Sequence, residues 1–403
     1  MSCAIPTGSD VLLLYAARGV RGFGDGFAII ILPAYLSAIG FDPVWVGIVA
    51  TASLLGSAVL TLAVGFLGAR YDLRALLLVG ALLMMATGLA FPQFENIAFI
   101  VLVAFIGTVN PSTGDIGMLV PLEHAMLARA VPDQERTRAF ARYSLIGALA
   151  TAAGSLAAAA PDFLVPAGVN AIDAFKAMFY VYAALGLVGA ALYQRLPRVE
   201  AKDIRTNTSA LGPSRGIVYK LAALFSLDAF AGGFVVQSLL ALWLFERFDL
   251  SLSAASLFFF WSSVLSAFSY PVAAWLSTHI GLINTMVFTH IPSSLCLIVA
   301  AFSPNVAIAL ALLLIRSALS QMDVPTRTSY TMAVVTPAER TAAASVTAVP
   351  RSLASSLSPA LGGVLLTSWF SGLPLVVCGC LKIVYDLALL WSFRHVRPPE
   401  ENN

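Results

Sequence analysis

Long apolar stretches follow one another along the chain, and their length restricts what the chain can fold into. A window of about 19 residues finds twelve of them, each long enough to cross the ~30 Å hydrocarbon core of a bilayer as a helix. Only 11% of the 403 residues are charged, against roughly 25% in soluble domains. The stretches also lack the ~10-residue alternation of membrane-barrel strands. We therefore predict an all-α membrane protein with twelve transmembrane helices.

The twelve stretches form two sets of six on either side of the longest polar segment. The first set covers residues 11–39, 45–68, 74–91, 97–128, 140–160 and 177–195. The second set covers residues 218–245, 252–276, 282–302, 306–333, 342–368 and 373–393. The segment between them is rich in Ser, Thr, Pro and charge, which is typical of a linker. We predict two six-helix bundles, residues 1–195 and 218–403, joined by a linker at 196–217.

Basic residues in the loops predict how the chain is oriented in the membrane. If the N-terminus is inside, sixteen lysines and arginines fall on the inner side, Arg351 among them. Only Lys176 and Arg247 fall on the outer side. Because cytosolic loops carry the excess of Lys and Arg, both termini and the linker are predicted to be cytosolic. We expect an integral protein of a plasma membrane, specifically a bacterial inner membrane.

Two segments of the first half recur in the second half at nearly the same spacing. Residues 26–42 align with 233–249 at an offset of 207, and residues 118–137 align with 322–341 at an offset of 204. The first predicted span thus corresponds to the seventh, and the fourth to the tenth. This pattern indicates a duplicated six-span unit with pseudo-symmetric halves. Repeated halves around a site near the midplane are typical of secondary transporters.

The loop between the second and third predicted spans contains a family motif. Its sequence, GFLGARYDLRA at residues 65–75, resembles the major facilitator superfamily signature G-x-L-[AG]-D-[RK]-x-G-x-[RK]. The matching residues are Gly65, Leu67, Gly68, Arg70 and Arg74, whereas Ala69 replaces the usual acid and Asp72 the usual second glycine. In the eleventh span SPALGG, residues 358–363, is similar to a Pro-x-x-Gly-Gly element of the superfamily. Span number, duplication and linker extend the resemblance over nearly the whole chain.

The resemblance implies a secondary active transporter that works by alternating access, with a cytosolic gate at this loop. We assign to the gate the residues Gly65, Arg70, Asp72, Arg74, Glu135, Arg136, Glu339 and Arg340. A simpler interpretation stays open for each group. The two loop arginines can serve only to keep the loop in the cytosol. The repeated Glu–Arg pairs can be two ordinary helix starts.

Ionisable residues inside the predicted spans indicate where a cavity lies. A charge at a helix centre costs roughly 2.5–3.5 kcal/mol on insertion scales, so it should face a partner or water. Ten of twelve such groups fall in spans 1, 4, 7 and 10, the helices that line the central cavity in the superfamily. We predict a substrate and proton cavity lined by Arg18, Arg21, Asp25, Asn110, Asp115, Asp228, Arg316, Asp323 and Arg327.

The remaining ionisable groups are given structural interpretations. Glu123 and His124 are expected at the cytosolic interface, and His290 is expected to pack in the interior. Lys382 and Asp386 are four residues apart, so they are expected to neutralise each other on one helix face. Residues 108–115, TVNPSTGD, are the strongest candidate for a broken helix.

Spacing and repeat predict two sets of ion pairs. Arg21 and Asp25, like Asp323 and Arg327, are four residues apart and share a helix face. Under the repeat, Arg21 corresponds to Asp228, so related positions carry opposite charges. We expect Arg21 to pair with Asp25 in its own helix or with Asp228 across the halves. The same opposition relates Glu123 to Arg327.

The function we predict is proton-coupled efflux of a small organic molecule. Uptake or exchange of an organic anion through Arg18, Arg21 and Arg316 is the alternative, and a membrane ligand sensor that moves nothing is a weaker one. The sequence has no Walker-type phosphate loop and no nucleophile–base motif, so neither an ATP-driven pump nor an enzyme is expected. We expect the small-molecule substrate, protons and lipid as partners, no nucleic acid, no cofactor or metal, and a monomer.

Overall fold

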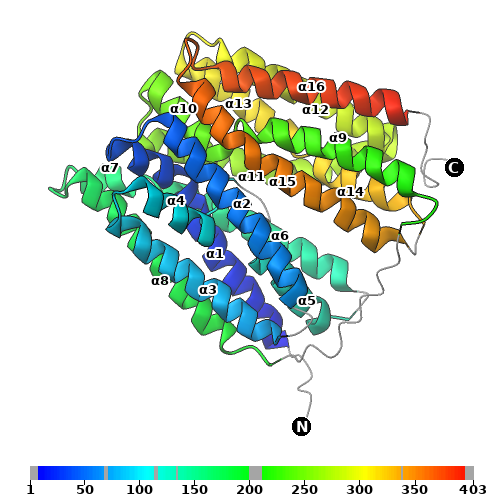
Figure 1. The fold of residues 1–403 in the computed structure, drawn as a ribbon, viewed down its shortest axis with the longest axis horizontal. Helices are drawn as coiled ribbons and strands as arrows, with labels where there is room; N and C mark the ends of the chain where they lie inside the picture. The colour runs from blue at the N-terminus through cyan, green and yellow to red at the C-terminus, as the bar shows by residue number, and fades with distance from the viewer. Residues whose placement is uncertain are drawn as a thin grey trace. The chain divides into compact units, whose positions relative to one another are not determined.

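The computed structural model describes residues 8–67, 71–112, 117–132, 135–198, 211–336 and 339–394. Within these ranges the chain is helical and forms no strand, as Figure 1 shows. The predicted all-α fold is confirmed. Each of the twelve apolar stretches is occupied by one helix or by two consecutive ones.

The first six predicted spans are occupied by seven of the helices. They are α1 (Gly8–Ala38), α2 (Pro43–Leu67), α3 (Leu73–Ala90), α4 (Ile97–Ile106), α5 (Leu119–Ala130), α6 (Arg136–Ala157) and α8 (Ala171–Tyr193). The short helices η1 (Phe91–Gln93) and α7 (Ala160–Leu164) lie in connections. The fourth span is divided between α4 and α5, so its two parts can present their side chains in different directions.

The second six spans are occupied by eight helices. They are α9 (Arg215–Gly233), α10 (Gln237–Phe248), α11 (Leu252–Ile280), α12 (Leu282–Ala301), α13 (Val306–Ser320), α14 (Asp323–Ala333), α15 (Arg340–Leu366) and α16 (Leu373–Phe393). The seventh span is divided between α9 and α10, and the tenth between α13 and α14. The divided spans 4 and 10 are related by the repeat.

Ten stretches of the described chain are long and apolar enough to cross a membrane. The fourth and eleventh predicted spans are the two that do not meet this measure. The fourth is broken between α4 and α5, and the eleventh, α15, is rich in Ser and Thr. Such hydroxyls can bond within their own helix, as the Thr347 hydroxyl does to Ala343 O at 2.8 Å. The fourth span thus misses the measure because its helix is interrupted and the eleventh because its sequence is polar, and both remain helical.

The predicted break in span 4 is present in the residues described there. Helix α4 ends at Ile106, Gly107 caps it, and α5 begins only at Leu119. A Cβ on Gly107 would lie 2.5 Å from the Val103 carbonyl oxygen, so only glycine fits the turn. Non-helical backbone at membrane depth is tolerated where it is buried in protein or faces water. The break therefore marks the interior side of this span.

The internal repeat is visible in individual hydrogen bonds. The Arg136 Nε donates to Ala128 O at 3.0 Å, and the Arg340 Nε donates to Met332 O at 3.2 Å. Both donor and acceptor are displaced by the predicted offset of 204. The two bonds join the end of α5 to the start of α6, and the end of α14 to the start of α15. The duplication thus extends from sequence to local geometry.

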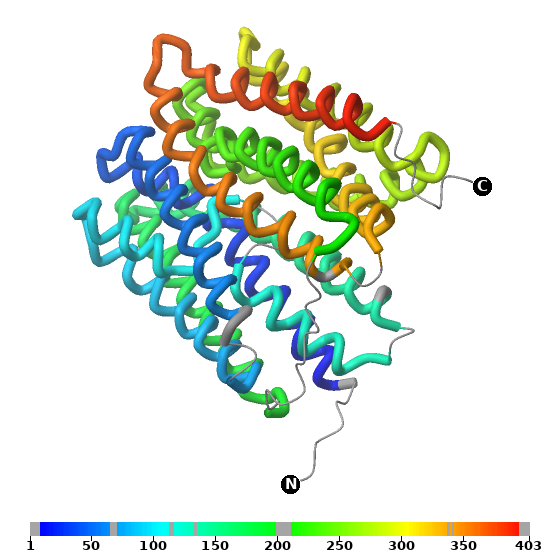
Figure 2. The backbone as a smooth tube through the Cα atoms, turned by 45° about the vertical axis from the view of Figure 1, so that its right-hand side comes forward, coloured from blue at the N-terminus to red at the C-terminus, as the bar shows by residue number. Residues whose placement is uncertain are grey.

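The helices form two compact units. One contains the described residues of 1–205 together with 249–260, and the other those of 206–248 together with 261–403. In the first unit α1 packs on α6 and α8, and α3 packs on α8. In the second, α9 packs on α15 and α16, and α12 packs on α16. Figures 1 and 2 show these pairs side by side. The packing is equivalent in both units, while the predicted boundaries at 195 and 218 stay a prediction.

Close helix contacts rest on small residues at repeated positions. A Cβ added to Gly26 would lie 2.1 Å from the Thr151 carbonyl oxygen, where α1 crosses α6. A Cβ added to Gly233 would lie 2.0 Å from the Ser358 hydroxyl oxygen, where α9 crosses α15. Positions 26 and 233 are related by the offset of 207. Small residues let the backbones approach closely, which is the usual basis of helix association in membranes.

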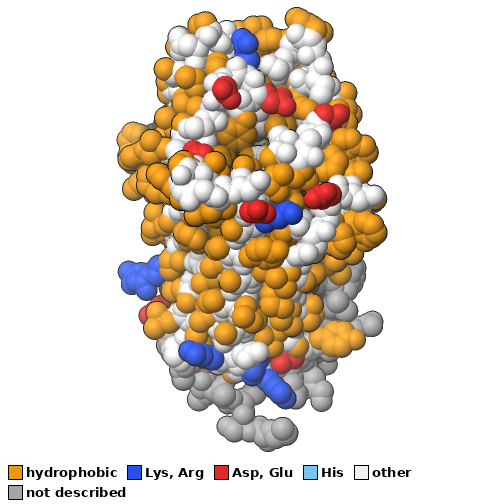
Figure 3. Space-filling view, turned by 90° about the vertical axis from the view of Figure 1, so that its left-hand side faces the viewer, with side chains coloured by type: hydrophobic (Ala, Val, Ile, Leu, Met, Phe, Trp, Pro, Cys, Tyr) orange, Lys and Arg blue, Asp and Glu red, His pale blue; other side chains and the backbone are white. Residues whose placement is uncertain are grey.

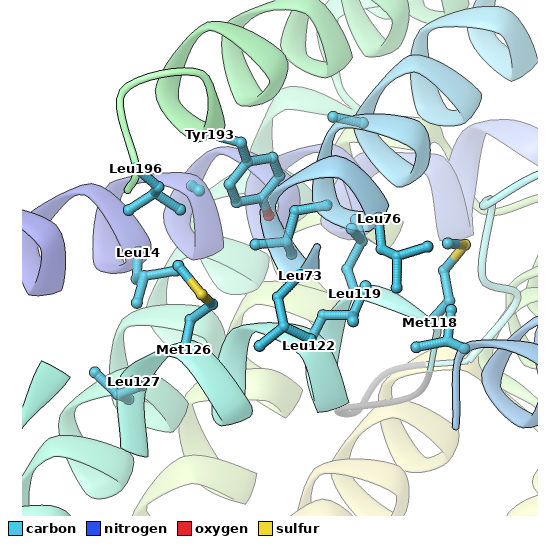
Figure 4. Close-up of a cluster of buried hydrophobic side chains, with 14 of the residues drawn as sticks. Leu14, Leu73, Leu76, Met118, Leu119, Leu122, Met126, Leu127, Tyr193 and Leu196 are labelled. Atoms are coloured by element: carbon cyan, nitrogen blue, oxygen red, sulfur yellow. The ribbon is translucent and has the colours of Figure 1, made fainter. Parts of the chain in front are cut away.

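Apolar side chains lie both inside and outside the fold. On the face shown in Figure 3 hydrophobic side chains predominate, and exposed large residues such as Phe163, Trp275 and Trp391 suit contact with lipid. Inside the first unit, a cluster centred on Leu14, Leu122 and neighbouring residues packs α1, α3, α5 and α8 together (Figure 4). This cluster holds the helix faces that carry the ionisable groups described next.

Candidate functional site: two buried ionisable clusters

Ionisable side chains gather inside each unit. In the first unit, the Arg21 Nη2 of α1 donates to the Glu123 Oε2 of α5 at 2.6 Å. The same oxygen accepts from the Tyr143 hydroxyl, and Glu123 Oε1 accepts from the Tyr193 hydroxyl at 2.7 Å. The Glu123 side chain is 0% exposed. Three donors from three helices therefore satisfy this buried carboxylate.

The expectation that Glu123 lies at the cytosolic interface was wrong. Because α5 begins only at Leu119, after the break, Glu123 lies one turn inside it and faces α1, α6 and α8. The signal in the sequence was its repeat relation to Arg327, which already lay in the predicted cavity. The tyrosines at 143 and 193 were also missed, because single tyrosines in apolar spans carry no pattern.

Asp25 is not the ion-pair partner of Arg21. Among the described residues Asp25 forms no ion pair within 4 Å, and Arg21 binds Glu123 instead. Asp25 is partly exposed and interacts with the Tyr182 hydroxyl, which also contacts Thr108 Oγ1 at 3.3 Å. The i, i+4 spacing brings Arg21 and Asp25 onto one face, but the carboxylate on α5 competes successfully for the guanidinium.

Asp228 is the centre of the second cluster. Its Oδ2 accepts from the Arg327 Nη2 at 3.2 Å, and its Oδ1 accepts from the Lys382 Nζ at 2.7 Å. Arg327 also pairs with Asp323 one turn earlier on α14, as the spacing predicted. Asp228, Asp323 and Arg327 are all buried. Helices α9, α14 and α16 are thus linked through one carboxylate.

The cluster continues from Lys382 to α12. The Lys382 Nζ lies 3.2 Å from His290 Nε2, and His290 Nδ1 lies 3.0 and 3.1 Å from the two Asp386 oxygens. Lys382 and Asp386 therefore do not form a self-contained pair, and His290 does more than pack, so both expectations were wrong. Helix α16 packs on both α9 and α12. Lys382 therefore contacts Asp228 and His290, and Asp386 contacts His290.

The two clusters are related by the repeat, with the charges reversed. Arg21 pairs with Glu123 in the first unit, and Asp228 pairs with Arg327 in the second. Arg21 corresponds to Asp228 and Glu123 to Arg327 under the offsets of 207 and 204. In both units the pair joins the first helix of the half to the second part of the divided span. Each of the opposite charges predicted at related positions thus finds its ion-pair partner within its own unit.

The other predicted cavity residues have different surroundings. Arg18 lies over the Tyr143 ring, 5.2 Å from its centroid. Asn110 is buried, and its Oδ1 accepts from the Ser112 N–H at 3.0 Å, which shapes the break. Arg316 is partly exposed and its side chain forms no ion pair with any described residue. Asp115 lies outside the described residues.

Arg351 lies within a helix although it was counted among the loop residues of the inner side. It lies in the middle of α15, and its side chain is exposed. It interacts electrostatically with Arg327, Asp228 and Tyr385. The predicted span 342–368 already contained it, so its position was available from the sequence, and Arg351 is a helix residue rather than a loop residue.

Six of the eight predicted gate residues lie at helix starts. Asp72 caps α3, because its Oδ1 accepts from the Arg74 N–H at 3.1 Å. Glu135 immediately precedes α6 and Glu339 immediately precedes α15, so Arg136 and Arg340 are the first helical residues. Gly65 lies in the last turn of α2, and Arg70 lies outside the described residues. These positions agree with the helix-start interpretation, and the gating role stays a prediction.

Glu339 has a further set of contacts, and its repeat partner Glu135 has no equivalent set among the described residues. Its carboxylate accepts from the Ser214 and Thr336 hydroxyls, each at 2.6 Å, and from the Gly212 N–H. These donors favour the charged carboxylate, and they lower the pKa of Glu339 from its usual 4.5 to about 2. Glu339 thus ties the segment before α9 to the start of α15.

Metal binding finds no support in the part of the chain that the structure describes. No group of three or more His, Cys, Asp or Glu side chains is arranged there to hold a metal ion. The carboxylates of the second cluster are instead bound by Arg327, Lys382 and His290. Both clusters therefore hold carboxylates in direct contact with cationic side chains.

Known transporters share the fold. The nucleoside transporter NupG superimposes with a TM-score of 0.75 at 14% identity, covering 96% of this chain and 100% of its own. The D-xylose-proton symporter gives 0.75 at 16% identity, covering 98% and 99%. A bacterial homolog of the human lysosomal transporter Spinster gives 0.71 at 16% identity, covering 95% and 96%. At these identities the likeness shows the fold alone.

Sequence comparison identifies the family. An uncharacterized membrane protein of Saccharomyces cerevisiae is 22% identical over 421 residues, which cover 95% of this chain and 94% of the yeast protein. The family model of the Major Facilitator Superfamily matches residues 14–243 and 221–403, nearly the whole chain. These matches agree with the helical fold and its two related halves. The chain is an integral membrane protein and belongs to the Major Facilitator Superfamily.

Proposed function

We propose that the protein is a proton-coupled secondary transporter that exports a small organic solute. The family supports a secondary transporter, and the coupling to protons is our inference from one observation. Asp228, Lys382, His290 and Asp386 form a continuous chain of polar contacts inside the second unit. Ionisable groups at membrane depth commonly mark proton and substrate pathways.

The contacts of His290 define how the chain would respond to a proton. Lys382 is a donor only, so His290 Nε2 must accept from it, and Nδ1–H must donate to Asp386. A proton that binds Nε2 removes this acceptor and places a positive charge 3.2 Å from the Lys382 Nζ. The ammonium is then repelled from His290 and its bond to Asp228 changes. Protonation would thereby alter how α9, α12 and α16 are held together.

The first cluster is the less suitable proton site. Glu123 is fully buried and accepts from Arg21, Tyr143 and Tyr193 at once. None of the three donors readily takes up a proton near neutral pH. We therefore assign Glu123 a structural role and the second cluster the coupling role.

A flux experiment in proteoliposomes tests the coupling. Radiolabelled uridine, D-xylose and D-gluconate represent a nucleoside, a sugar and an organic anion. We expect a pH gradient to drive at least one probe above its equilibrium distribution. His290→Gln should reduce this gradient-driven accumulation at least about tenfold, because Gln accepts from Lys382 but cannot take up the proton. Vesicles that expose the predicted cytosolic face outward, acidic inside, should accumulate the probe if the direction is export.

The matched control is the exposed histidine of the same unit, His279 at the end of α11. The variant His279→Gln should keep the full response to the gradient. The proposal fails if the His290→Gln variant and Asp386→Asn both retain gradient-driven accumulation, or if no probe responds to the gradient in the wild type.

Uptake or exchange of an organic anion is the second candidate. Arg316 favours it, since this cation lies within a span and forms no ion pair with the described residues. Exchange would show as D-gluconate counterflow in the absence of a pH gradient, and it would be insensitive to His290→Gln. Cytosolic termini, a bacterial inner membrane and a monomeric state stay predictions.

A further inference from the structure

The start of α11 is bound by a side chain from a distant part of the chain. The Asp162 Oδ2 of α7 accepts from the Ser253 N–H at 2.8 Å and from the Ser253 hydroxyl at 2.7 Å. Ser253 is the second residue of α11, so its N–H has no partner within that helix. A carboxylate at a helix N-terminus also interacts favourably with the helix dipole. Asp162 therefore holds the first turn of α11 through two charge-assisted hydrogen bonds.

The bond joins the two halves of the sequence. Asp162 lies in the first predicted six-span half and Ser253 lies in the second. Residues 249–260 nevertheless belong to the first compact unit, whereas α11 continues from Trp261 in the second. Helix α11 thus passes from one unit to the other, and Asp162 ties its first turn to α7 in the first unit.

The repeat shows the arrangement from which this contact departs. Asp42 corresponds to Asp249 under the offset of 207. In the first half, Asp42 accepts from the Trp45 N–H at 3.1 Å and so caps its own following helix, α2. In the second half Asp249 is exposed, and Ser251 and Asp162 accept from the N–H groups at the start of α11. The capping of this span therefore depends partly on another segment of the chain.

Helix α11 also has a cap of its own. The Ser251 hydroxyl oxygen accepts from the Ala254 N–H at 3.2 Å, and the Ser251 carbonyl accepts from the Ala255 N–H at 3.0 Å. These local bonds do not involve Asp162. Asp162 and Ser253 are both only partly buried, so water can replace each as the partner of the other. The contact can therefore break without unfolding the start of α11.

We propose that the Asp162–Ser253 bond is an outer latch, which closes the outer side of the transporter when it is made and releases α11 when it breaks. In the predicted orientation, α7 and the connection before α11 lie on the outer side. Rocking of one half against the other requires contacts between the halves to break where the protein opens. Asp162 is thus a gating residue. This inference rests on the proposed transport function, but not on its coupling to protons.

The accessibility of a single cysteine tests the latch without knowledge of the solute. The reporter is Ser256→Cys in a background without native cysteines, because Ser256 is 1% exposed and lies one turn after Ser253. Purified full-length protein in detergent is treated with a bulky polar maleimide. We expect Asp162→Ala to raise the labelling rate at least about tenfold, since two hydrogen bonds to a charged group are lost.

Two variants serve as matched controls for the labelling. Asp173→Ala removes an exposed aspartate of the same unit, in the first turn of α8, and should leave the rate unchanged. Ser251→Ala removes the local cap of α11 and should raise the rate much less than Asp162→Ala. The inference is overturned if Ser251→Ala has the full effect, because the labelling then reports fraying of the helix end. It is also overturned if Asp162→Ala has no effect.

Cross-linking tests whether the contact must break during transport. In the double variant Asp162→Cys with Ser253→Cys, a short bis-methanethiosulfonate should arrest downhill flux of the transported probe in proteoliposomes, and dithiothreitol should restore it. The matched pair is Gln93→Cys with Tyr180→Cys, because these side chains bond at 3.0 Å within the first half and their cross-link should leave flux intact. Full flux through the cross-linked latch would contradict the inference.

The two proposals fail separately. If a pH gradient drives none of the probes, the proton-coupling proposal fails, and labelling of the Ser256→Cys reporter still decides whether Asp162 is a latch. Conversely, gradient-driven flux with unchanged labelling in the Asp162→Ala variant would end the latch inference and leave proton coupling intact.

Discussion

At the scale of single residues, Glu123 and Asp228 show how one repeated ion pair acquires two roles. Glu123 is bound by an arginine and two tyrosine hydroxyls, none of which changes charge near neutral pH. Asp228 is bound by Arg327 and by Lys382, which also contacts His290. Only the second carboxylate is connected to a group whose ordinary pKa is near neutral. We therefore expect the first pair to hold the fold and the second to respond to protons.

Glu339 gives a pH prediction at the same scale. Its pKa is about 2 in the folded protein, against an ordinary 4.5, because Ser214, Thr336 and Gly212 donate to the carboxylate. A lowered folded-state pKa means that the unfolded chain binds more protons between these values. The stabilisation is present above about pH 4.5 and is lost as the pH falls toward 2. We expect Glu339→Gln to lower the Tm at pH 7 and to flatten its fall between pH 5 and 3.

The repeat supplies the control for this prediction. Glu135 occupies the equivalent helix start but is exposed, so Glu135→Gln should change neither the Tm at pH 7 nor its pH dependence appreciably. Equal pH profiles for wild type and the Glu339→Gln variant would contradict the prediction.

At the scale of helices, the contact of α1 with α6 depends on small residues, and so does that of α9 with α15. Gly26 faces the backbone of α6, and Gly154 on α6 faces the backbone of α1 at Phe23 O. In the second unit, Gly233 faces Ser358. The first helix of each half carries one member of the ion pair, Arg21 on α1 and Asp228 on α9. This contact therefore fixes the axial position and the rotation of the helix that presents each side chain to its cluster.

Two alanine substitutions on α1 separate packing from helix propensity. Alanine favours a helix over glycine by about 1 kcal/mol. At Gly26 the new methyl group would lie 2.1 Å from a carbonyl oxygen, whereas at Gly19 the nearest atom is 3.6 Å away. We expect Gly26→Ala to destabilise by about 1–3 kcal/mol through overpacking, and Gly19→Ala to be neutral or stabilising. Unfolding in detergent measures both, and similar effects at the two sites would refute the packing argument.

At the scale of the whole molecule, duplication supplies the architecture and divergence supplies the chemistry. The two units share helix packing and the Arg-to-carbonyl bonds at related helix starts. They differ in the groups around the repeated ion pair, since two tyrosine hydroxyls bind Glu123 in the first unit and Lys382 binds Asp228 in the second. Equivalent halves can thus differ in which of them is expected to respond to protons.

The orientation of the whole chain is tested by labelling. The excess of basic loop residues predicts a cytosolic linker, so in a background without native cysteines Ser209→Cys should resist a membrane-impermeant maleimide in intact cells. Arg247→Cys, on the predicted outer side, should react. Rapid labelling of the linker cysteine, with protection of the other, would reverse the assigned topology.

The sequence by itself determined the class of fold, the number of spans and their pairing by duplication. Apolar length and repeat offset are local or linear properties, so they can be read without a structure. The break near Asn110 and the pair Asp323–Arg327 were predictable for the same reason. The opposed charges at Arg21 and Asp228 were visible through the repeat.

Only the tertiary structure decided which charges meet. Arg21 is four residues from Asp25 in sequence, yet it binds Glu123, because packing brings α5 against α1 and presents a carboxylate held by two tyrosines. Likewise Lys382 binds Asp228 rather than Asp386, because α16 lies against α9. The spacing of residues along one helix predicts which side chains share a face. The choice among partners depends on the neighbouring helices, because a buried charge is stabilised by whichever counter-charges and donors the packing supplies.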